Sequence, residues 1–178
     1  MVTRLRRALS TVMVTLVLAL SASAAAPEVI DRIMAVVAGQ PVTLSDVNAA
    51  LLFQLTPAPA GTRDPLAFAL DRLIDRHLML SEVDRFQPPE PAPVEINLRI
   101  QEIEQRMGAP AAFDRALAVT GTTREELRRH IRDDLRIATY LNQRFGANPD
   151  LAERATAIAA WVGELRRRAE ITVQYQSQ

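Results

Sequence analysis

Three kinds of residue are missing or scarce in this 178-residue chain, and each gap excludes a class of structure or chemistry. Without cysteine, the chain has no disulfides, no cysteine metal sites, no thiol catalysis and no cysteine-linked lipid. Aromatic residues make up only 4% of the chain against 48% hydrophobic residues, so the core must be aliphatic. Lysine is also missing, and all 21 basic residues are arginines. A GC-rich genome explains this more simply than selection for guanidinium chemistry.

Residues 1–25 have the pattern of a secretory signal peptide. Three arginines come first, and an apolar run at 12–20 and a group of small residues follow. The apolar run is shorter than the ~20 residues of a membrane-spanning helix, so we expect cleavage after Ala24 or Ala25 and no membrane span afterwards. The remaining chain, 26–178, carries 18 arginines and 21 acidic residues, a net charge of −3. This charge argues against a nucleic-acid partner.

The stretch 31–46, DRIMAVVAGQPVTLSD, predicts a β-hairpin followed by the start of a helix. An apolar, β-favouring run is interrupted by Gly39 and Pro41, and Thr43 has the character of a helix N-cap. Because a two-stranded hairpin is marginally stable alone, we expect a strand within 170–175, EITVQY, to join it. The sequence therefore predicts a mainly α fold, closed by a small antiparallel sheet of an N-terminal hairpin and a C-terminal strand.

Helical periodicity and capping signals predict about six helices between the hairpin and the final strand. Asp64 followed by Pro65 marks one start, and Thr123 with Glu126 forms a capping box at another. The segment 94–107 alternates like a strand at first, but helix formers dominate its second half, and we interpret it as a helix. The expected helices span 44–55, 65–86, 94–107, 110–120, 124–145 and 149–169.

The last expected helix has the most regular apolar seam. Asn148 is the expected N-cap and Pro149 the first helical residue. The spacing of the seam predicts that one face of the helix is buried. We therefore expect the helix and strand at 149–175 to pack back onto the rest of a single domain, 26–178. The seam consists of Leu151, Ala155, Ile158, Val162, Leu165 and Ala169.

Few residues are available for catalysis. We expect His77 to be packed in an apolar helix face with one hydrogen bond, and His130 to be solvated among arginines. The acidic pair at 133–134 fits surface ion pairs along one helix, and the arginines within 128–136 and 166–168 fit a solvated face. The chain has neither a glycine-rich phosphate loop nor a nucleophile elbow. The sequence therefore indicates no catalytic residue, no cofactor and no metal site.

Apolar surface is what remains for a function. Wide apolar helix stripes, flexible methionines and proline-containing loops suit a groove that accepts apolar segments of other chains. The same residues would also serve as core, and the pattern alone leaves both interpretations open. The candidate peptide-binding residues are Leu52, Leu55, Met79, Met107 and Phe113.

Four blocks of the sequence carry a further signal. They are DRIMAVVAGQPVTLSDV at 31–47, DRLIDRHLMLSEVDRF at 71–86, FDRALAVTGTTREELRRHIRDDLRIATYLNQRF at 113–145 and AWVGELRRRAEITV at 160–173. In this order they resemble the SurA-type periplasmic chaperones, which are relatives of the parvulin foldases. Where that family usually has asparagine before the turn glycine, this chain has alanine, and we expect the glycine alone to take the unusual φ.

The chain departs from this family at one place. Family members usually carry parvulin isomerase domains between the long helix and the C-terminal segment, and here only GANPD, 146–150, separates the two. No isomerase site can be transferred, so we do not expect an enzyme. The resemblance implies an ATP-independent periplasmic chaperone for unfolded or partly folded outer-membrane or secreted proteins. The alternative is a non-catalytic envelope scaffold with one defined partner, which includes a homodimer.

Overall fold

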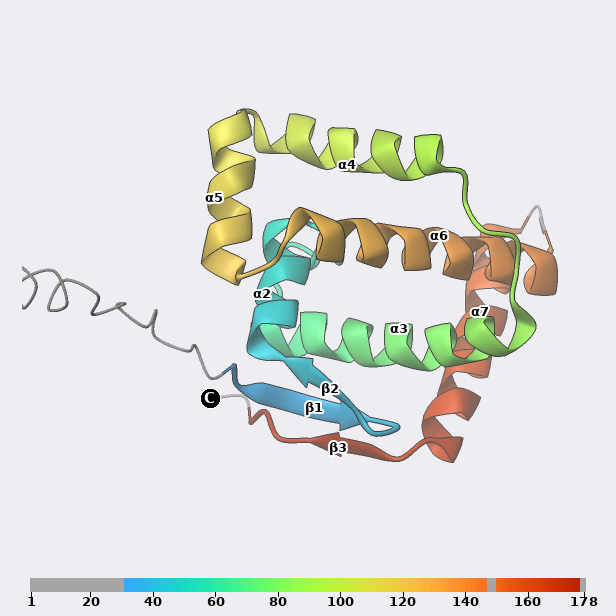
Figure 1. Ribbon diagram of the computed structural model, residues 1–178. Helices are drawn as coiled ribbons and strands as arrows, with labels where there is room; N and C mark the ends of the chain where they lie inside the picture. The colour runs from blue at the N-terminus through green and yellow to red at the C-terminus, as the bar shows by residue number, and fades with distance from the viewer. Residues whose placement is uncertain (1–30, 147–149, 177–178) are drawn as a thin grey trace, which may run out of the picture. The chain divides into compact units, whose positions relative to one another are not determined.

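The computed structural model describes residues 31–146 and 150–176. The predicted signal peptide at 1–25 and the predicted helix start at Asn148 and Pro149 lie outside these residues. In the described part, six helices and three strands follow the order β1, β2, α2, α3, α4, α5, α6, α7, β3 (Figure 1). The mainly helical fold with a small sheet agrees with the prediction.

The sheet joins the two ends of the described chain. Strand β1 (Ile33–Val37) lies in the centre, with β2 (Gln40–Thr43) on one side and β3 (Ile171–Val173) on the other, and both pairings are antiparallel (Figure 1). The backbone N–H of Gln174 donates to the carbonyl of Met34 at 2.8 Å, which extends the contact beyond β3. The predicted return of the C-terminal strand to the hairpin is confirmed.

The turn between β1 and β2 differs from the expectation in one respect. Ala38 has φ of 48° and Gly39 has φ of 80°, so both turn residues are left-handed, as in a type I′ hairpin. The expectation that Gly39 alone takes the unusual φ was therefore wrong. The N–H of Ala38 donates to the carbonyl of Glu170 at 2.8 Å, and this bond ties the turn to the chain entering β3. Pairing on both sides of β1 thus fixes a conformation that alanine disfavours.

Helix α2 (Leu44–Leu52) begins as its sequence predicts and ends earlier. The Thr43 side chain accepts a hydrogen bond from the Asp46 N–H, and the Asp46 carboxylate accepts one from the Thr43 N–H, which completes a capping box. The predicted helix ran to residue 55, but Phe53 is the C-cap, and its side chain is buried among other apolar residues.

Helix α3 (Pro65–Phe86) is the central element. Asp64 caps it by accepting from the Ala67 N–H at 2.8 Å, with Pro65 in the first position. The sheet, α2, α6 and α7 all contact it, which explains why it is apolar on more than one side. Its buried apolar residues are Ala69, Leu70, Leu73, Ile74, Leu78 and Val83.

Three helices form the outer part of the fold, over α2 and α3. They are α4 (Pro93–Met107), α5 (Pro110–Thr120) and α6 (Arg124–Phe145), and α6 lies between α3 and α4 (Figure 1). The ambiguous segment 94–107 is helical, as predicted. These helices enclose a second apolar core with α2, which contains Phe53, Ile96, Ile103, Phe113, Leu127 and Ile131.

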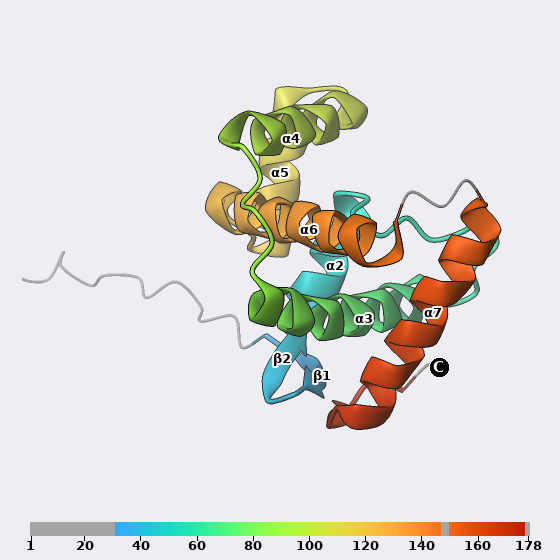
Figure 2. The same cartoon turned by 90° about the vertical axis from the view of Figure 1, so that its right-hand side faces the viewer.

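Helix α7 (Leu151–Arg168) runs across α3 instead of along it (Figures 1 and 2). Its N-cap is Asp150, whose carboxylate accepts from two N–H groups of the first turn.

The predicted burial of the whole apolar seam of α7 was wrong. Val162 and Leu165 are buried, whereas Leu151 is 76% exposed, because α3 passes under only the C-terminal half of α7. Trp161, which the sequence analysis did not single out, is buried against the end of α6.

The hairpin turn gives a direct stability test. Ala38→Asn should raise the free energy of unfolding by about 0.5–1 kcal/mol, because asparagine tolerates a positive φ better than alanine and Asn-Gly suits a type I′ turn. The melting temperature from circular dichroism should then rise by roughly 1–4 °C for a domain of this size. A melting temperature at or below the wild-type value would show that the turn is not strained at Ala38.

Candidate functional site

A groove lies between α3, α6 and α7 and encloses a cavity of about 680 Å³. One wall comes from α6 and the other from α7, and Met79 of α3 together with Leu55 after α2 completes the apolar lining. Because Leu55 and Met79 are distant in sequence from α6 and α7, only the folded chain forms the groove. Its apolar lining residues are Leu55, Met79, Ile137, Ala138, Leu141, Ala155, Ile158, Ala159, Val162 and Gly163.

Small side chains on α7 explain why the groove is open. Ala155, Ala159 and Gly163 recur every four residues, so they share one face of the helix and line the groove together. Their size leaves space that larger residues would fill. The crossing of α7 over α3 adds to this space, because it leaves α6 and α7 in contact over only a short length (Figure 2).

The structure separates the five candidate peptide-binding residues. Leu55 and Met79 line the groove, and both are half-buried. Leu52 is 43% exposed but lies outside the groove lining. Met107 packs against the second core, and Phe113 is 0% exposed with its ring 5.7 Å from the Phe53 ring. In this fold Phe113 is a core residue without accessible surface, so its assignment to a peptide-binding surface is corrected.

Most residues of the groove were not predicted from the sequence. Leu141 belongs to the apolar stripe that helical spacing marks on α6, Ile158 and Val162 belong to the seam of α7, and Ile137 lies outside that stripe. The helical spacing of the first three identified the correct faces, and these faces were interpreted as core. One sequence signal for the groove was available: Ala155, Ala159 and Gly163 lie four residues apart on α7. Small residues at this spacing either let another helix pack closely or leave a hollow beside the helix.

An ionic cluster closes one end of the groove and holds α7 to α3. Asp75 is only 6% exposed, and its carboxylate accepts from Arg166 Nε at 2.5 Å and lies 2.9 Å from Arg72 Nη2. Arg166 also donates to the Asp71 carboxylate at 2.6 Å and to the Asp71 carbonyl. The expectation of a solvated face at 166–168 was thus wrong for Arg166, which bridges two helices.

The pKa of the Asp71 carboxyl reflects this cluster. Burial alone would raise it, but the hydrogen bonds from Arg72 and Arg166 and the charges of both arginines lower it below its ordinary value. Asp71 therefore stays ionised in the fold over a wider pH range than in the unfolded chain.

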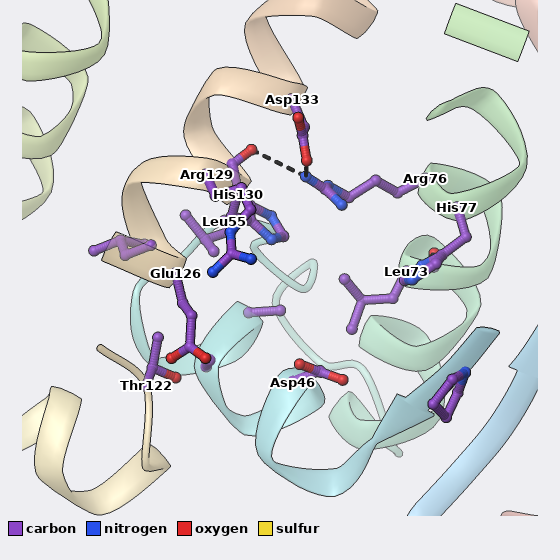
Figure 3. A pocket seen from close by; sticks show the side chains of 14 residues that line it. Asp46, Leu55, Leu73, Arg76, His77, Thr122, Glu126, Arg129, His130 and Asp133 are labelled. Carbon is purple, nitrogen blue, oxygen red and sulfur yellow. Dashed lines mark hydrogen bonds and ion pairs between the residues drawn. The ribbon is translucent and has the colours of Figure 1, made fainter. Parts of the chain in front are cut away.

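A second, polar cavity of about 280 Å³ lies between α2, α3 and α6. Figure 3 shows Arg129 and His130 of α6 and Arg76 and His77 of α3 around this space, with Asp46 of α2 beside them. Two groups are already engaged locally: Asp46 caps α2, and His77 Nδ1 lies 2.9 Å from the Leu73 carbonyl. The hydrogen bond of His77 matches the packed histidine that the sequence predicted.

Arg76 joins α3 to α6 at the edge of this polar cavity. Its Nε donates to the Asp134 carboxylate at 2.6 Å. Its Nη2 donates to the His130 carbonyl at 3.0 Å and lies 3.7 Å from the Asp133 carboxylate (Figure 3). The predicted pairing along the helix is present between Asp133 and Arg136 at 3.7 Å, but both side chains are largely buried, and both carboxylates of residues 133–134 also face Arg76 of another helix. Burial raises the pKa of the Asp133 carboxyl, although Arg76, Arg132 and Arg136 oppose the rise.

The arginines along α6 also make tertiary contacts. Arg132 binds the Glu90 carboxylate through two nitrogens at 2.7 and 2.8 Å. Arg136 is buried, with Asp84 at 2.9 Å. The solvated arginine face that the sequence predicted is therefore in part an interface between α6, the end of α3 and the loop before α4. Planar guanidinium groups suit such paired contacts.

His130 is not solvated, contrary to the expectation. Its side chain is 21% exposed, and Nε2 lies 3.4 Å from an Asp134 carboxylate oxygen. Burial and the neighbouring Arg76 lower the pKa of His130 to about 4, although the negative charge of Asp134 acts in the opposite direction. The imidazole is therefore neutral at neutral pH.

In the described ranges, no group of three or more histidine, cysteine, aspartate or glutamate residues has the geometry to hold a metal ion. No helix among the described residues is long and apolar enough to cross a membrane. No protein-family model matches the chain, and the comparison with curated proteins finds no match.

The contact between α3 and α7 is tested by two adjacent arginines. Arg166→Ala should lower the free energy of unfolding by about 1–3 kcal/mol, because it leaves the buried Asp75 with only Arg72. Arg167→Ala should change it by less than about 0.5 kcal/mol, since Arg167 is exposed and its nearest carboxylate, Glu164, is 3.8 Å away. Equal losses in urea denaturation would contradict the bridging role of Arg166.

Proposed function

We propose that this protein is an ATP-independent periplasmic chaperone that holds apolar segments of unfolded outer-membrane or secreted proteins in the groove between α3, α6 and α7. One observation supports the proposal most strongly: a folded, charged protein keeps an apolar hollow of about 680 Å³ open at its surface. Open apolar surface of this kind is unfavourable in water unless a partner covers it. The resemblance of four sequence blocks to SurA-type chaperones points to the same activity.

The dimensions of the groove suit a short stretch of polypeptide. Binding pockets for organic ligands usually span about 300–1,000 Å³, and this groove lies within that range. Met79 adds a flexible, polarisable side chain that adapts to different apolar partners. The walls consist mostly of small and aliphatic residues, and the arginines and aspartates of the lining pair with one another, so the groove imposes little hydrogen-bonding pattern on a bound chain. The groove is therefore expected to select for apolarity and to accept many sequences.

Binding of this kind needs no energy source. A protein that binds the unfolded state lowers the free concentration of the aggregating species, by mass action alone. The proposal includes no catalytic step and no prolyl isomerase activity, because only residues 146–150 separate α6 from α7, where SurA-type proteins usually carry isomerase domains. The protein would act as a holding chaperone.

Two alanines of α7 provide a matched test. The assay is light scattering of an outer-membrane β-barrel protein diluted from urea, with the chaperone at stoichiometric ratio. Wild type should suppress the scattering, and Ala159→Glu should weaken the suppression roughly tenfold, because it places a carboxylate on the apolar wall. Ala160→Glu is the control, since Ala160 is exposed on the same helix and lies outside the groove lining.

The outcome decides whether the groove carries the activity. Wild-type protein that leaves the scattering unchanged would remove the chaperone proposal. Equal activity of the two glutamate variants would place client binding elsewhere on the surface. Circular dichroism of both variants confirms that each remains helical, so that a loss of activity reports on the groove.

The second candidate is a non-catalytic envelope scaffold that binds one defined partner, including a second copy of this chain. The uncovered half of the α7 seam favours it, because Leu151 is 76% exposed and Ala155 is exposed at the regular spacing that packs against a helix. A single stoichiometric partner in pull-downs, with no effect on unrelated unfolded proteins, would support the scaffold over the chaperone.

A further inference from the structure

The polar cavity and the groove share part of one wall. Leu55, Arg76 and His130 line both spaces, so these three side chains lie between a water-accessible ionic pocket and an apolar hollow. Arg76 closes the wall from α3 by binding Asp134 and the His130 carbonyl of α6. The separation of the two spaces therefore depends on a small number of contacts between α3 and α6.

Charged and titratable groups face His130 from three helices. From α3 come Arg76 and His77, and from α2 comes Asp46 (Figure 3). From α6 itself, Asp134 lies 3.4 Å from Nε2, and three more charged residues line the same cavity. These three are Glu126, Arg129 and Asp133.

Adding a proton to His130 is unfavourable while the wall is closed. The imidazole is mostly buried, and its Nε2 has no hydrogen-bond partner among the described residues. Arg76 already brings a positive charge to the Asp134 carboxylate that would have to neutralise an imidazolium. A charged group in this position gains most from water. Separation of α3 and α6 at Arg76 would expose the buried Nε2 to water, and it would also join the polar cavity to the groove.

We propose that the contact of Arg76 with α6 is an acid-sensitive gate, in which protonation of His130 opens the shared wall and enlarges the apolar surface of the groove. The use of the gate rests on the proposed function. Acidification unfolds envelope proteins, and the enlarged groove would then bind more of these unfolded clients. The opening itself is a property of the fold and needs no client.

The size of the effect follows from linkage. In the closed state the pKa of His130 is about 4, and in an open, hydrated state it would return towards the ordinary 6.5. Protons therefore favour the open state as pH falls below about 6.5, and the effect saturates near pH 4. At pH 5 the equilibrium between closed and open states shifts by roughly thirtyfold.

The test uses the two histidines of the chain as a matched pair. Nile red, an uncharged apolar dye, is titrated into the purified protein between pH 7.5 and 4.5, and the emission of the single tryptophan, Trp161, reports in parallel on the fold. The wild type should bind the dye several-fold more tightly at pH 5 than at pH 7.5. His77→Gln should behave like the wild type, and His130→Gln should show no such rise.

A second variant tests the gate from the other side. Arg76→Gln removes the closing contact, so it should bind the dye tightly at both pH values. A flat wild-type response, a rise that persists in His130→Gln, or a rise that coincides with a red shift of Trp161 emission would each overturn the gate. Dye binding needs no client, so a working gate in a protein that fails to suppress aggregation would refute the proposed function alone.

Discussion

The pairing of β3 with β1 is the constraint on which the rest of the structure depends. It returns the C-terminal segment to the first strand of the domain, and the Tyr175 hydroxyl then donates to the Asp64 carboxylate, the N-cap of α3, at 3.0 Å. Because only Ala169 and Glu170 separate α7 from β3, this pairing fixes the C-terminal end of α7 across α3. One wall of the groove is thus positioned by a strand of three residues.

Arginine supplies the second level of organisation. Arg166 attaches α7 to α3 through Asp71 and Asp75, and Arg76 attaches α3 to α6. Each helix that borders the groove is therefore connected to its neighbour by a guanidinium group beside the apolar surface. Charged groups at the margin and apolar side chains inside let a hydrophobic site remain open at the surface of the fold. In the proposed gate, the contact of Arg76 with α6 also makes this margin respond to the protonation of His130.

Local signals in the sequence predicted most of the fold, and contacts between distant segments account for what was missed. The caps at Asp64 and Thr123 depend on neighbouring residues, so the starts of α3 and α6 were correct. The spacing of apolar residues showed which face of α7 is apolar. Only the way in which α7 crosses α3 decides that Val162 is buried and Leu151 is exposed. The partners of Arg166 lie more than ninety residues away in the sequence, and no pattern on α7 identifies them.

Removal of the residues after Ala169 tests the central claim most directly. The account predicts that the truncated chain melts at a lower temperature and loses Nile red binding at neutral pH, because α7 is no longer fixed across α3 and the groove loses a wall. Trp161 emission should shift to the red as α7 leaves the core. A truncated chain with the melting temperature and dye affinity of the full chain would show that the returning strand does not build the site.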